Sequence, residues 1–215
     1  MTEIPDSIEY KYGKEGEKIV CELFKDMGFE VNFVGVEHRK HFIENISARD
    51  IYSPDLKLYD SFNEQTFYVE IKSLIISRDR EFIIDKELLL NYFKYYPENS
   101  FLVLYIPENN KIGMKRIKDL ATQKFREITL KDGRTLLYFK FETFNRLNYY
   151  ARKHHFSYKF GWNTNNDEEF DDKIESFLKS RQDRIRPLLE EFKLIKSHSK
   201  QWNIHTIKFK KKRHK

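Results

Sequence analysis

Two acidic residues and a lysine are spaced so that they could act together on a phosphodiester. Asp55 follows Ser53 and Pro54, and Glu70 and Lys72 lie fifteen and seventeen residues after Asp55. Metal-dependent hydrolysis needs carboxylates to hold the cation and groups that neutralise the charge developing on the phosphate. The three residues could act together only if the predicted secondary structure brings their side chains close to one another.

The sequence between Asp55 and Lys72 predicts a β-hairpin, because hydrophobic and polar residues alternate in both of its arms. Side chains of a strand point alternately to opposite faces, so the aliphatic residues share one face and the acids and lysine share the other. A turn centred on Phe62-Asn63 would place Asp55 opposite Glu70, with Cβ atoms roughly 5 Å apart. Two carboxylates that close repel each other unless a cation lies between them. The pattern therefore predicts a divalent metal site.

A predicted helix before the hairpin carries a third acid. Apolar residues recur at helical spacing over about Ser7–Met27, and Gly28 is a typical stop signal. Glu17 lies three and seven residues before Val20 and Phe24, which places it on the apolar stripe of this helix. We therefore expect the Glu17 side chain to point toward the sheet.

Pro54-Asp55, the run Glu70-Ile71-Lys72-Ser73 and the helix acid Glu17 together resemble the PD-(D/E)XK nuclease superfamily over about residues 8–106. The order of helix, hairpin and strand carries the resemblance more than the short strings do. It implies that Asp55 and Glu70 bind the metal, that the backbone carbonyl of Ile71 is a further ligand, and that Glu17 reaches the metal through water. The catalytic residues it implies are Glu17, Asp55, Glu70 and Lys72.

The expected fold class is α/β, a restriction-endonuclease-like mixed sheet flanked by helices, with a C-terminal helical extension. The expected function is that of a Mg²⁺-dependent DNA endonuclease (a hydrolase), with Mn²⁺ able to substitute. Mg²⁺ prefers oxygen ligands, and a bound metal activates water for attack. Lys72 would orient that water, help to deprotonate it, or stabilise the pentavalent phosphate.

The identity of the substrate leaves several hypotheses open. The sequence has no evident recognition helix or target-reading domain, which favours branched DNA, as cut by the dimeric archaeal Holliday junction resolvases of the superfamily. A homodimer is therefore expected. The alternatives are a sequence-specific restriction-type endonuclease, a non-catalytic nuclease-fold DNA-binding protein, and an RNA-binding module, which would leave the Asp55/Glu70 pairing unexplained. The structural alternative for Asp55, Glu70 and Lys72 is an exposed sheet face with a Glu–Lys pair.

Basic residues near the hairpin and in the last eight positions are expected to contact DNA. The final eight residues hold six Lys or Arg and no acid, so they account for the whole formal charge of +6. Such a segment favours nucleic acid through counterion release, although a solvated solubility segment is the alternative. The predicted contacts, some of them to phosphate beside the site, are Ser73, Arg78, Arg80, Lys208, Lys210, Lys211, Lys212, Arg213 and Lys215.

Composition narrows the class of protein. A single cysteine excludes an intramolecular disulfide, no apolar run approaches the length of a membrane span, and no signal-peptide pattern is present. A soluble intracellular protein with no membrane partner is expected. The scarcity of alanine and abundance of Ile, Lys and Glu, taken with the motif, resemble the nuclease-like proteins of spindle-shaped archaeal viruses, which would imply the host cytoplasm.

The remaining pattern predicts further elements and a domain organisation. Strands are expected at about 29–36, 55–60, 65–73, 81–84 and 101–106, a helix at 85–96, and a hairpin that turns at 131–134. A helical stripe over about 170–195 should be kinked or divided near Arg186 by Pro187. The predicted organisation is a nuclease-like core at 1–160, a helical extension at 161–207 and a basic tail at 208–215.

Overall fold

The computed structural model describes residues 7–34, 52–74, 81–96, 98–120, 122–153, 156, 161–162, 164 and 166–198. It confirms the mixed α/β fold class, a mixed sheet flanked by helices. Its elements are α1 (Ile8–Met27), β1 (Glu30–Phe33), β2 (Leu56–Asp60), β3 (Gln65–Ser73), β4 (Glu81–Asp85), α3 (Lys86–Tyr95), β5 (Ser100–Ile106), β6 (Lys111–Arg116), α4 (Ile117–Leu120), β7 (Arg126–Thr129), β8 (Thr135–Lys140), β9 (Asn145–Arg146), α5 (Leu147–Lys153), α6 (Asp167–Lys179) and α7 (Gln182–His198), with 3₁₀ turns at Pro107–Asn109 and Phe141–Thr143.

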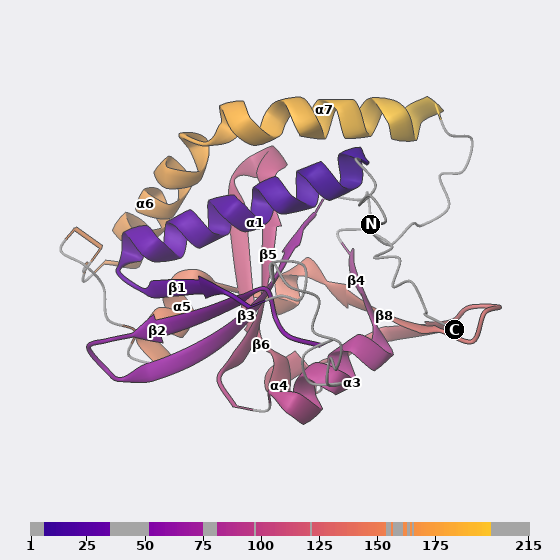
Figure 1. Cartoon of the computed structure of the whole chain (residues 1–215), viewed down its shortest axis with the longest axis horizontal. Helices are drawn as coiled ribbons and strands as arrows, with labels where there is room; N and C mark the ends of the chain where they lie inside the picture. Colours follow the sequence, from indigo (N-terminus) through magenta and orange to yellow (C-terminus); the bar gives the residue numbers. More distant parts are fainter. Residues whose placement is uncertain are drawn as a thin grey trace, which may run out of the picture.

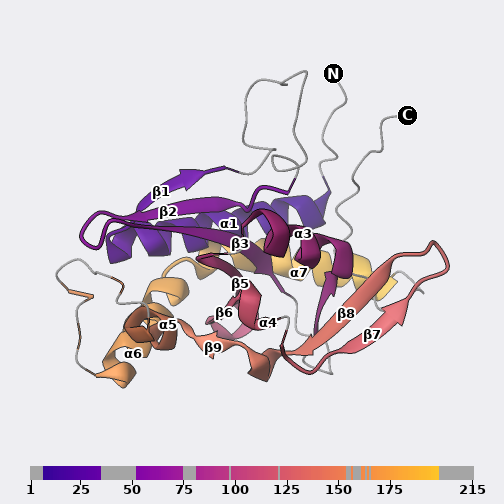
Figure 2. The ribbon, with the colours of Figure 1, turned by 90° about the horizontal axis from the view of Figure 1, so that it is seen from below.

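The strands form two sheets. The larger has six strands in the order β1-β2-β3-β5-β6-β9, and the smaller has the order β4-β8-β7. In the larger sheet β3 and β5 run parallel, whereas every other neighbouring pair is antiparallel. The β7–β8 hairpin projects away from the larger sheet (Figure 2). The mixed sheet therefore places β3, the strand with the candidate residues, at its centre.

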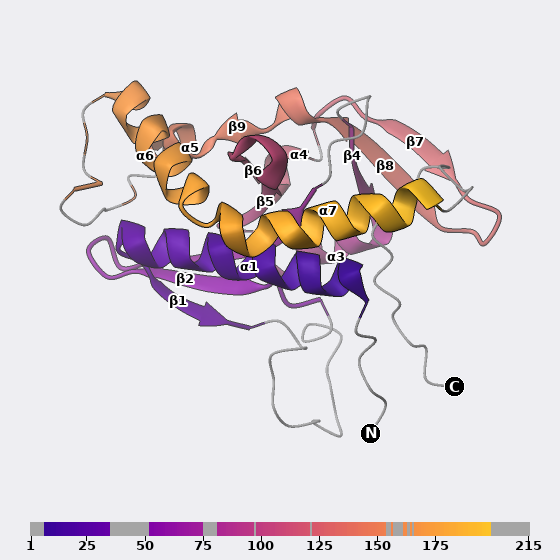
Figure 3. The same ribbon diagram turned by 90° about the horizontal axis from the view of Figure 1, so that it is seen from above.

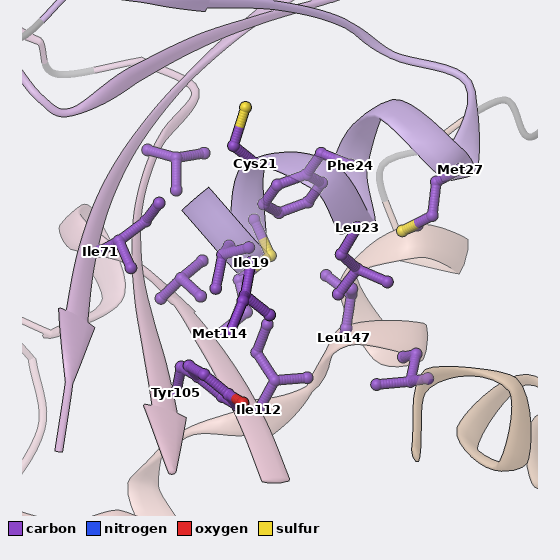
Figure 4. Close-up of a cluster of buried hydrophobic side chains, with 14 of the residues drawn as sticks. Ile19, Cys21, Leu23, Phe24, Met27, Ile71, Tyr105, Ile112, Met114 and Leu147 are labelled. Carbon is purple, nitrogen blue, oxygen red and sulfur yellow. The ribbon is translucent and has the colours of Figure 1, made fainter. Parts of the chain in front are cut away.

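Helix α1 begins and ends where the sequence predicts. The Ser7 side chain accepts a hydrogen bond from the backbone N–H of Tyr10 at 3.3 Å, which caps the first turn. Gly28 ends the helix with a φ of 115°, a left-handed conformation that glycine adopts without strain. The apolar side of α1 packs on the sheet, where Leu23 and Phe24 belong to the same buried cluster as Ile71 of β3, Tyr105 of β5 and Met114 of β6 (Figure 4).

The β2–β3 hairpin has the predicted register. Tyr59 pairs with Thr66 and Lys57 pairs with Tyr68. Asp60 stabilises the turn, because its carboxylate accepts hydrogen bonds from the backbone N–H groups of Phe62 at 3.0 Å and Asn63 at 3.2 Å. The alternation of side chains along β3 thus follows the expected phase.

Helices and the small sheet cover both faces of the larger sheet. One face packs against α1, α6 and α7, with α1 and α7 side by side (Figures 1 and 3). The other face packs against α3, α4 and the small sheet, in a separate cluster that includes Leu89, Leu102, Leu104 and Phe139. One face of β3 therefore faces α1, and its other face lies on the side of the sheet that α3, α4 and the small sheet cover.

The break in the C-terminal helical region lies earlier than predicted. Helix α6 ends at Lys179, and α7 begins at Gln182 and continues through Pro187. The predicted division near Arg186 is wrong, because Pro187 is only the sixth residue of α7 and its missing N–H removes a single hydrogen bond. A kink at Pro187 stays a prediction. The turn at residues 180–181 instead lets the apolar residues of both helices reach the core that they share with α1, namely Phe170, Ile174, Phe177, Leu178, Ile185, Leu189.

Helix α7 packs against α1 through an aromatic stack and ion pairs. The Tyr12 and Phe192 rings stack with centroids 5.9 Å apart, and the Arg184 guanidinium pairs with Glu15 at 2.6 Å and with Glu22 at 2.7 Å.

The division into a core at 1–160 and an extension at 161–207 stays a prediction. None of the helices in the described part of the chain is both long and apolar enough to cross a membrane.

Candidate functional site

Strand β3 carries Glu70 and Lys72 on the face opposite to Val69 and Ile71. Glu70 is only 4% exposed, and the Lys72 side chain is 13% exposed. The Lys72 Nζ donates a hydrogen bond to Glu70 Oε1, so the two form an ion pair within one strand. Because Asp55 is also buried, at 8% exposure, these residues do not form the exposed sheet face of the structural alternative.

Asp55 is held at the entrance to β2 by both its backbone and its side chain. Its carbonyl oxygen accepts a hydrogen bond from the backbone N–H of Val34 at 3.0 Å. Its Oδ2 accepts one from the backbone N–H of Ile71 at 2.7 Å. The hairpin register ends with Leu56 opposite Val69, so Asp55 and Glu70 are the next residues along the two strands. The hydrogen bond to Ile71 and the effect of the Glu70 charge on Asp55 show that the two predicted carboxylates lie near each other.

The surroundings of Asp55 disfavour its ionised form. Burial raises the Asp55 pKa well above its ordinary value, and the charges of Glu70 and Glu17 raise it further, while Lys72 and the Ile71 N–H partly offset these effects. Glu70 and Glu17 are therefore both near enough to Asp55 to raise its pKa. A bound cation would therefore stabilise the ionised form of these buried carboxylates.

Lys72 remains cationic in this environment. Burial lowers the Lys72 pKa, but the nearby Glu70 and Asp55 carboxylates outweigh burial, and the net pKa is raised above its ordinary value. At neutral pH the side chain is consequently an ammonium ion that can donate hydrogen bonds or stabilise negative charge. It is not available to accept a proton in this state.

Glu17 lies buried on α1, as its place on the apolar stripe predicts, with 4% exposure. Its Oε2 accepts a hydrogen bond from Lys14 Nζ at 2.7 Å. Lys14 belongs to none of the motifs that the sequence suggests, although its position three residues before Glu17 is a spacing at which helix side chains meet. Lys14 is thus a second lysine beside the candidate site.

Helix α3 covers the Glu70 side chain with a tyrosine. Tyr92 is buried, and its hydroxyl forms a hydrogen bond with the Glu70 carboxylate. Burial, and after it the charges of Glu70 and Asp55, raise the Tyr92 pKa well above its ordinary value, so the hydroxyl stays protonated. The helical spacing of α3 identifies Tyr92 as a core residue, but nothing in the sequence links it to Glu70.

Ser73 lies under α1 and not at the surface. Its exposure is 4%, and its Oγ has no hydrogen-bond partner among the described residues. A Cβ at Gly16 would meet this oxygen at 1.7 Å, so glycine is needed where the helix crosses the strand. Contact between Ser73 and a DNA phosphate stays a prediction. The other predicted DNA contacts lie outside the described residues: Arg78, Arg80, Lys208, Lys210, Lys211, Lys212, Arg213 and Lys215.

The donor set fits a magnesium ion that retains much of its water. Within the described ranges, no group of three or more His, Cys, Asp or Glu residues is arranged so that it could hold a metal ion. Asp55 and Glu70 supply two adjacent carboxylates, and Mg²⁺ commonly binds through one or two carboxylates and several waters. Glu17 does not join them as a third direct ligand, so its role through water stays a prediction.

Comparisons with known proteins give a structural similarity and no sequence match. No family model matches the sequence, and no curated protein matches it. Among solved structures, the chain is similar to Archaeoglobus fulgidus Hjc, a Holliday junction resolvase from an archaeal hyperthermophile. The identity is 9%, the TM-score is 0.42, and the similarity covers 65% of this chain and 95% of the resolvase. A TM-score this low carries no argument about function, and nothing in these comparisons supports the viral resemblance. The functional conclusion therefore rests on the site itself.

Proposed function

We propose that this protein is a Mg²⁺-dependent DNA endonuclease of the PD-(D/E)XK type. One observation carries the proposal: the β2–β3 hairpin brings two buried carboxylates, Asp55 and Glu70, together beside the cationic Lys72. Buried carboxylates are costly to desolvate and are kept where they are paired or bind metals. Metal-dependent phosphodiester hydrolysis uses this combination of groups.

Asp55 and Glu70 would hold the metal, together with the backbone carbonyl of Ile71. When bound, the metal neutralises charge on the scissile phosphate and lowers the pKa of a water. The Ile71 N–H fixes the orientation of the Asp55 carboxylate, and the Tyr92 hydroxyl does the same for Glu70. Lys72 would stabilise the negative charge that builds up on the phosphate. Of the roles considered for Lys72, deprotonating the water is disfavoured by the raised Lys72 pKa.

Branched DNA is the substrate class that we propose, acted on by a homodimer. The basic residues of 208–215 would add affinity for any DNA without reading its sequence, because contacts to phosphate carry no base information. The second candidate is a DNA-binding protein in which the same residues bind a cation but do not cleave. It is favoured by the pairing of each acid with a hydrogen-bond donor of the chain itself.

A cleavage assay on linear duplex, flap, four-way junction and single-stranded DNA, with Mg²⁺, with Mn²⁺ or with chelator, tests the proposal. We expect cleavage of the junction only with metal. Asp55→Asn and Glu70→Gln should each reduce it at least about a thousandfold, because metal-held charge stabilisation contributes several kcal/mol. Glu175→Gln, which neutralises an exposed acid on α6, is the matched control and should cut like the parent.

Two outcomes would contradict the proposal in different ways. Undiminished cleavage by both Asp55→Asn and Glu70→Gln would place the chemistry elsewhere in the chain. Tight DNA binding by the parent protein without cleavage of any substrate would favour the non-catalytic alternative.

A further inference from the structure

Strand β6 buries a lysine that the candidate site does not use. Lys115 is 9% exposed, and no other lysine in the described part of the chain is as buried. Lysine is almost never fully buried in proteins unless its charge is paired. The place of Lys115 inside β6 therefore requires an explanation.

The Lys115 side chain has no hydrogen-bond or ion-pair partner among the described residues. The next residue, Arg116, by contrast pairs with the Glu98 carboxylate at 3.0 Å. The Lys115 Nζ is not one of the fully buried polar atoms that lack a hydrogen bond, so the ammonium group reaches the surface. Lys115 therefore combines a buried stem with an unpaired charge at the surface.

The pairing of the strands places Lys115 on the same face of the larger sheet as Glu70. Glu70 of β3 lies opposite Leu102 of β5, and Leu102 lies opposite Lys115 of β6. Residues directly opposite each other on neighbouring strands point to the same face. The Cα atoms of Glu70 and Lys115 are therefore two strand spacings apart, which is roughly 10 Å.

Packing alone does not require a charge at this position. Leu102 and Ile117 belong to the buried cluster that α3, α4 and the small sheet form on this side of the larger sheet. A lysine stem can cover apolar surface while its ammonium group stays in water. An uncharged side chain of similar length, such as methionine, would fill that role as well. The ammonium group itself is therefore the feature to be explained.

We propose that Lys115 binds a phosphate group of the DNA, next to the phosphate that is cleaved at Asp55 and Glu70. This inference rests on the proposed function, because it assumes that Asp55 and Glu70 hold the scissile phosphate through a metal. Since the stem of Lys115 is already buried, its ammonium group loses little rotamer freedom when it donates to a phosphate. Successive phosphates of one strand lie about 3.4 Å apart along the duplex axis, so a cation roughly 10 Å from Glu70 suits a neighbouring phosphate.

The salt dependence of DNA binding, measured on the full-length protein with chelator to prevent cleavage, tests this contact. Fluorescence anisotropy of a labelled four-way junction gives the affinity at each salt concentration. For Lys115→Met we expect an affinity about tenfold lower at low salt, the loss of one charge-assisted hydrogen bond. The log–log salt slope should be smaller by about 0.9, which corresponds to one lost phosphate contact.

Two further variants serve as controls for the charge. Lys115→Arg keeps the positive charge and should bind the junction as the parent does. Lys111→Met removes an exposed charge from the start of the same strand, and it should leave affinity and salt slope unchanged. An equal loss with Lys111→Met would show an effect of net charge and would overturn the contact at Lys115.

Stability and cleavage rate separate a DNA contact from a structural role. Methionine preserves the stem, so Lys115→Met should unfold at the parent temperature or above it. Its cleavage rate at saturating DNA should equal that of the parent while KM rises about tenfold, because the contact is made equally before and during the reaction. If Lys115→Met does not fold, Lys115→Gln is a second uncharged variant for the same measurements. A lower unfolding temperature with unchanged DNA affinity would make Lys115 a packing residue and would overturn the inference.

The failure of this inference differs from the failure of the proposed function. A parent that cleaves the junction, together with a folded Lys115→Met that binds it with the same affinity and salt slope, overturns the role of Lys115 alone. A parent that does not bind DNA overturns the proposed function and this inference with it.

Discussion

The two faces of β3 are both buried, but they are stabilised in different ways. Phe67, Val69 and Ile71 pack against α1 in the larger hydrophobic cluster and are at most 2% exposed. On the other face, Glu70 and Lys72 alternate with them and are held by an ion pair and by a hydrogen bond from α3. One face is stabilised by apolar packing alone, and the other keeps charged groups in the interior.

Strand β5, parallel to β3 and next to it, shows what the sheet requires for folding alone. All seven of its residues are buried. Apart from Ser100 and the hydroxyl of Tyr105, its side chains are apolar toward α1, as with Val103, and apolar toward α3 and α4, as with Leu102 and Leu104. Burial of apolar surface is favourable, whereas burial of carboxylates is not. The charged face of β3 is therefore a local exception, of the kind that proteins make at functional sites.

Among the tests of this comparison between faces, the largest expected effect comes from removing the cation on the charged face. Lys72→Ala should slow cleavage at saturating DNA and Mg²⁺ by at least about a hundredfold, because it removes the ammonium group beside the phosphate. Val69→Ala, its counterpart on the apolar face, should lower the free energy of unfolding by about 2 kcal/mol through the loss of buried methyl groups, with little effect on the rate. Single-turnover cleavage and urea unfolding measure the two quantities.

The distinction between the two faces of β3 would be wrong if Lys72→Ala changed the stability and not the cleavage rate. A Lys72→Ala protein that cleaves at the parent rate but is much less stable would make the ion pair a structural feature. The charged face would then serve folding in the same way as the apolar one.

A second expected effect concerns stability and pH. In the presence of chelator, Asp55→Asn should be more stable than the parent at pH 8, by about 2 kcal/mol, because it removes a carboxylate that is buried beside two others. The amide oxygen introduced by this substitution can still accept the hydrogen bond from the Ile71 N–H. Because the folded-state pKa of Asp55 is raised above its ordinary 3.8, the stability associated with the protonated form is complete below that value. It is lost as the pH rises through the folded-state pKa.

Urea unfolding of parent and Asp55→Asn between pH 4 and pH 8 measures this difference. We expect the two curves to converge at the acidic end and to separate as the pH rises. Added Mg²⁺ should stabilise the parent more than the variant, since binding to the folded state shifts the unfolding equilibrium. A constant difference across the pH range would contradict the raised pKa of Asp55.

The hairpin and its acids could be predicted from the sequence because both depend on local pattern. Alternation predicts which residues share a face, and the turn at Phe62-Asn63 predicts the register that ends with Leu56 opposite Val69, next to Asp55 and Glu70. Helix α1 was equally accessible, because its apolar spacing and Gly28 define its phase and its end. A shift of one residue in any of these patterns would have separated the acids.

The partners of these acids could not be predicted in the same way, because they depend on tertiary packing. Tyr92 has the spacing of a core aromatic on its own helix, and only the docking of α3 on the sheet brings it to Glu70. The break between α6 and α7 likewise follows from how both helices reach one core, which outweighed the local effect of Pro187. Local sequence specifies which groups are present, and packing decides which of them meet.

The smallest expected effect tests whether α3 contributes to the charged face. Tyr92→Phe removes only the hydroxyl that contacts Glu70, and a hydrogen bond of this kind contributes about 1 kcal/mol. We expect cleavage at saturating DNA and Mg²⁺ to slow by about fivefold, with DNA affinity unchanged. Tyr95→Phe is the matched control, because Tyr95 stacks on Tyr52 and has no contact with Glu70 among its described interactions.

The pH dependence of the Tyr92→Phe effect distinguishes a positioning role from a chemical one. Because its pKa is raised well above the ordinary value, the Tyr92 hydroxyl remains protonated throughout the range from pH 6 to pH 9. The ratio of parent to variant rates should therefore be the same at every pH, as for a donor that only holds the Glu70 carboxylate in place. A ratio that changes with pH would mean that Tyr92 exchanges a proton during the reaction. A change in DNA affinity with an unchanged rate would place it at the DNA surface, and would leave the charged face of β3 without support from α3.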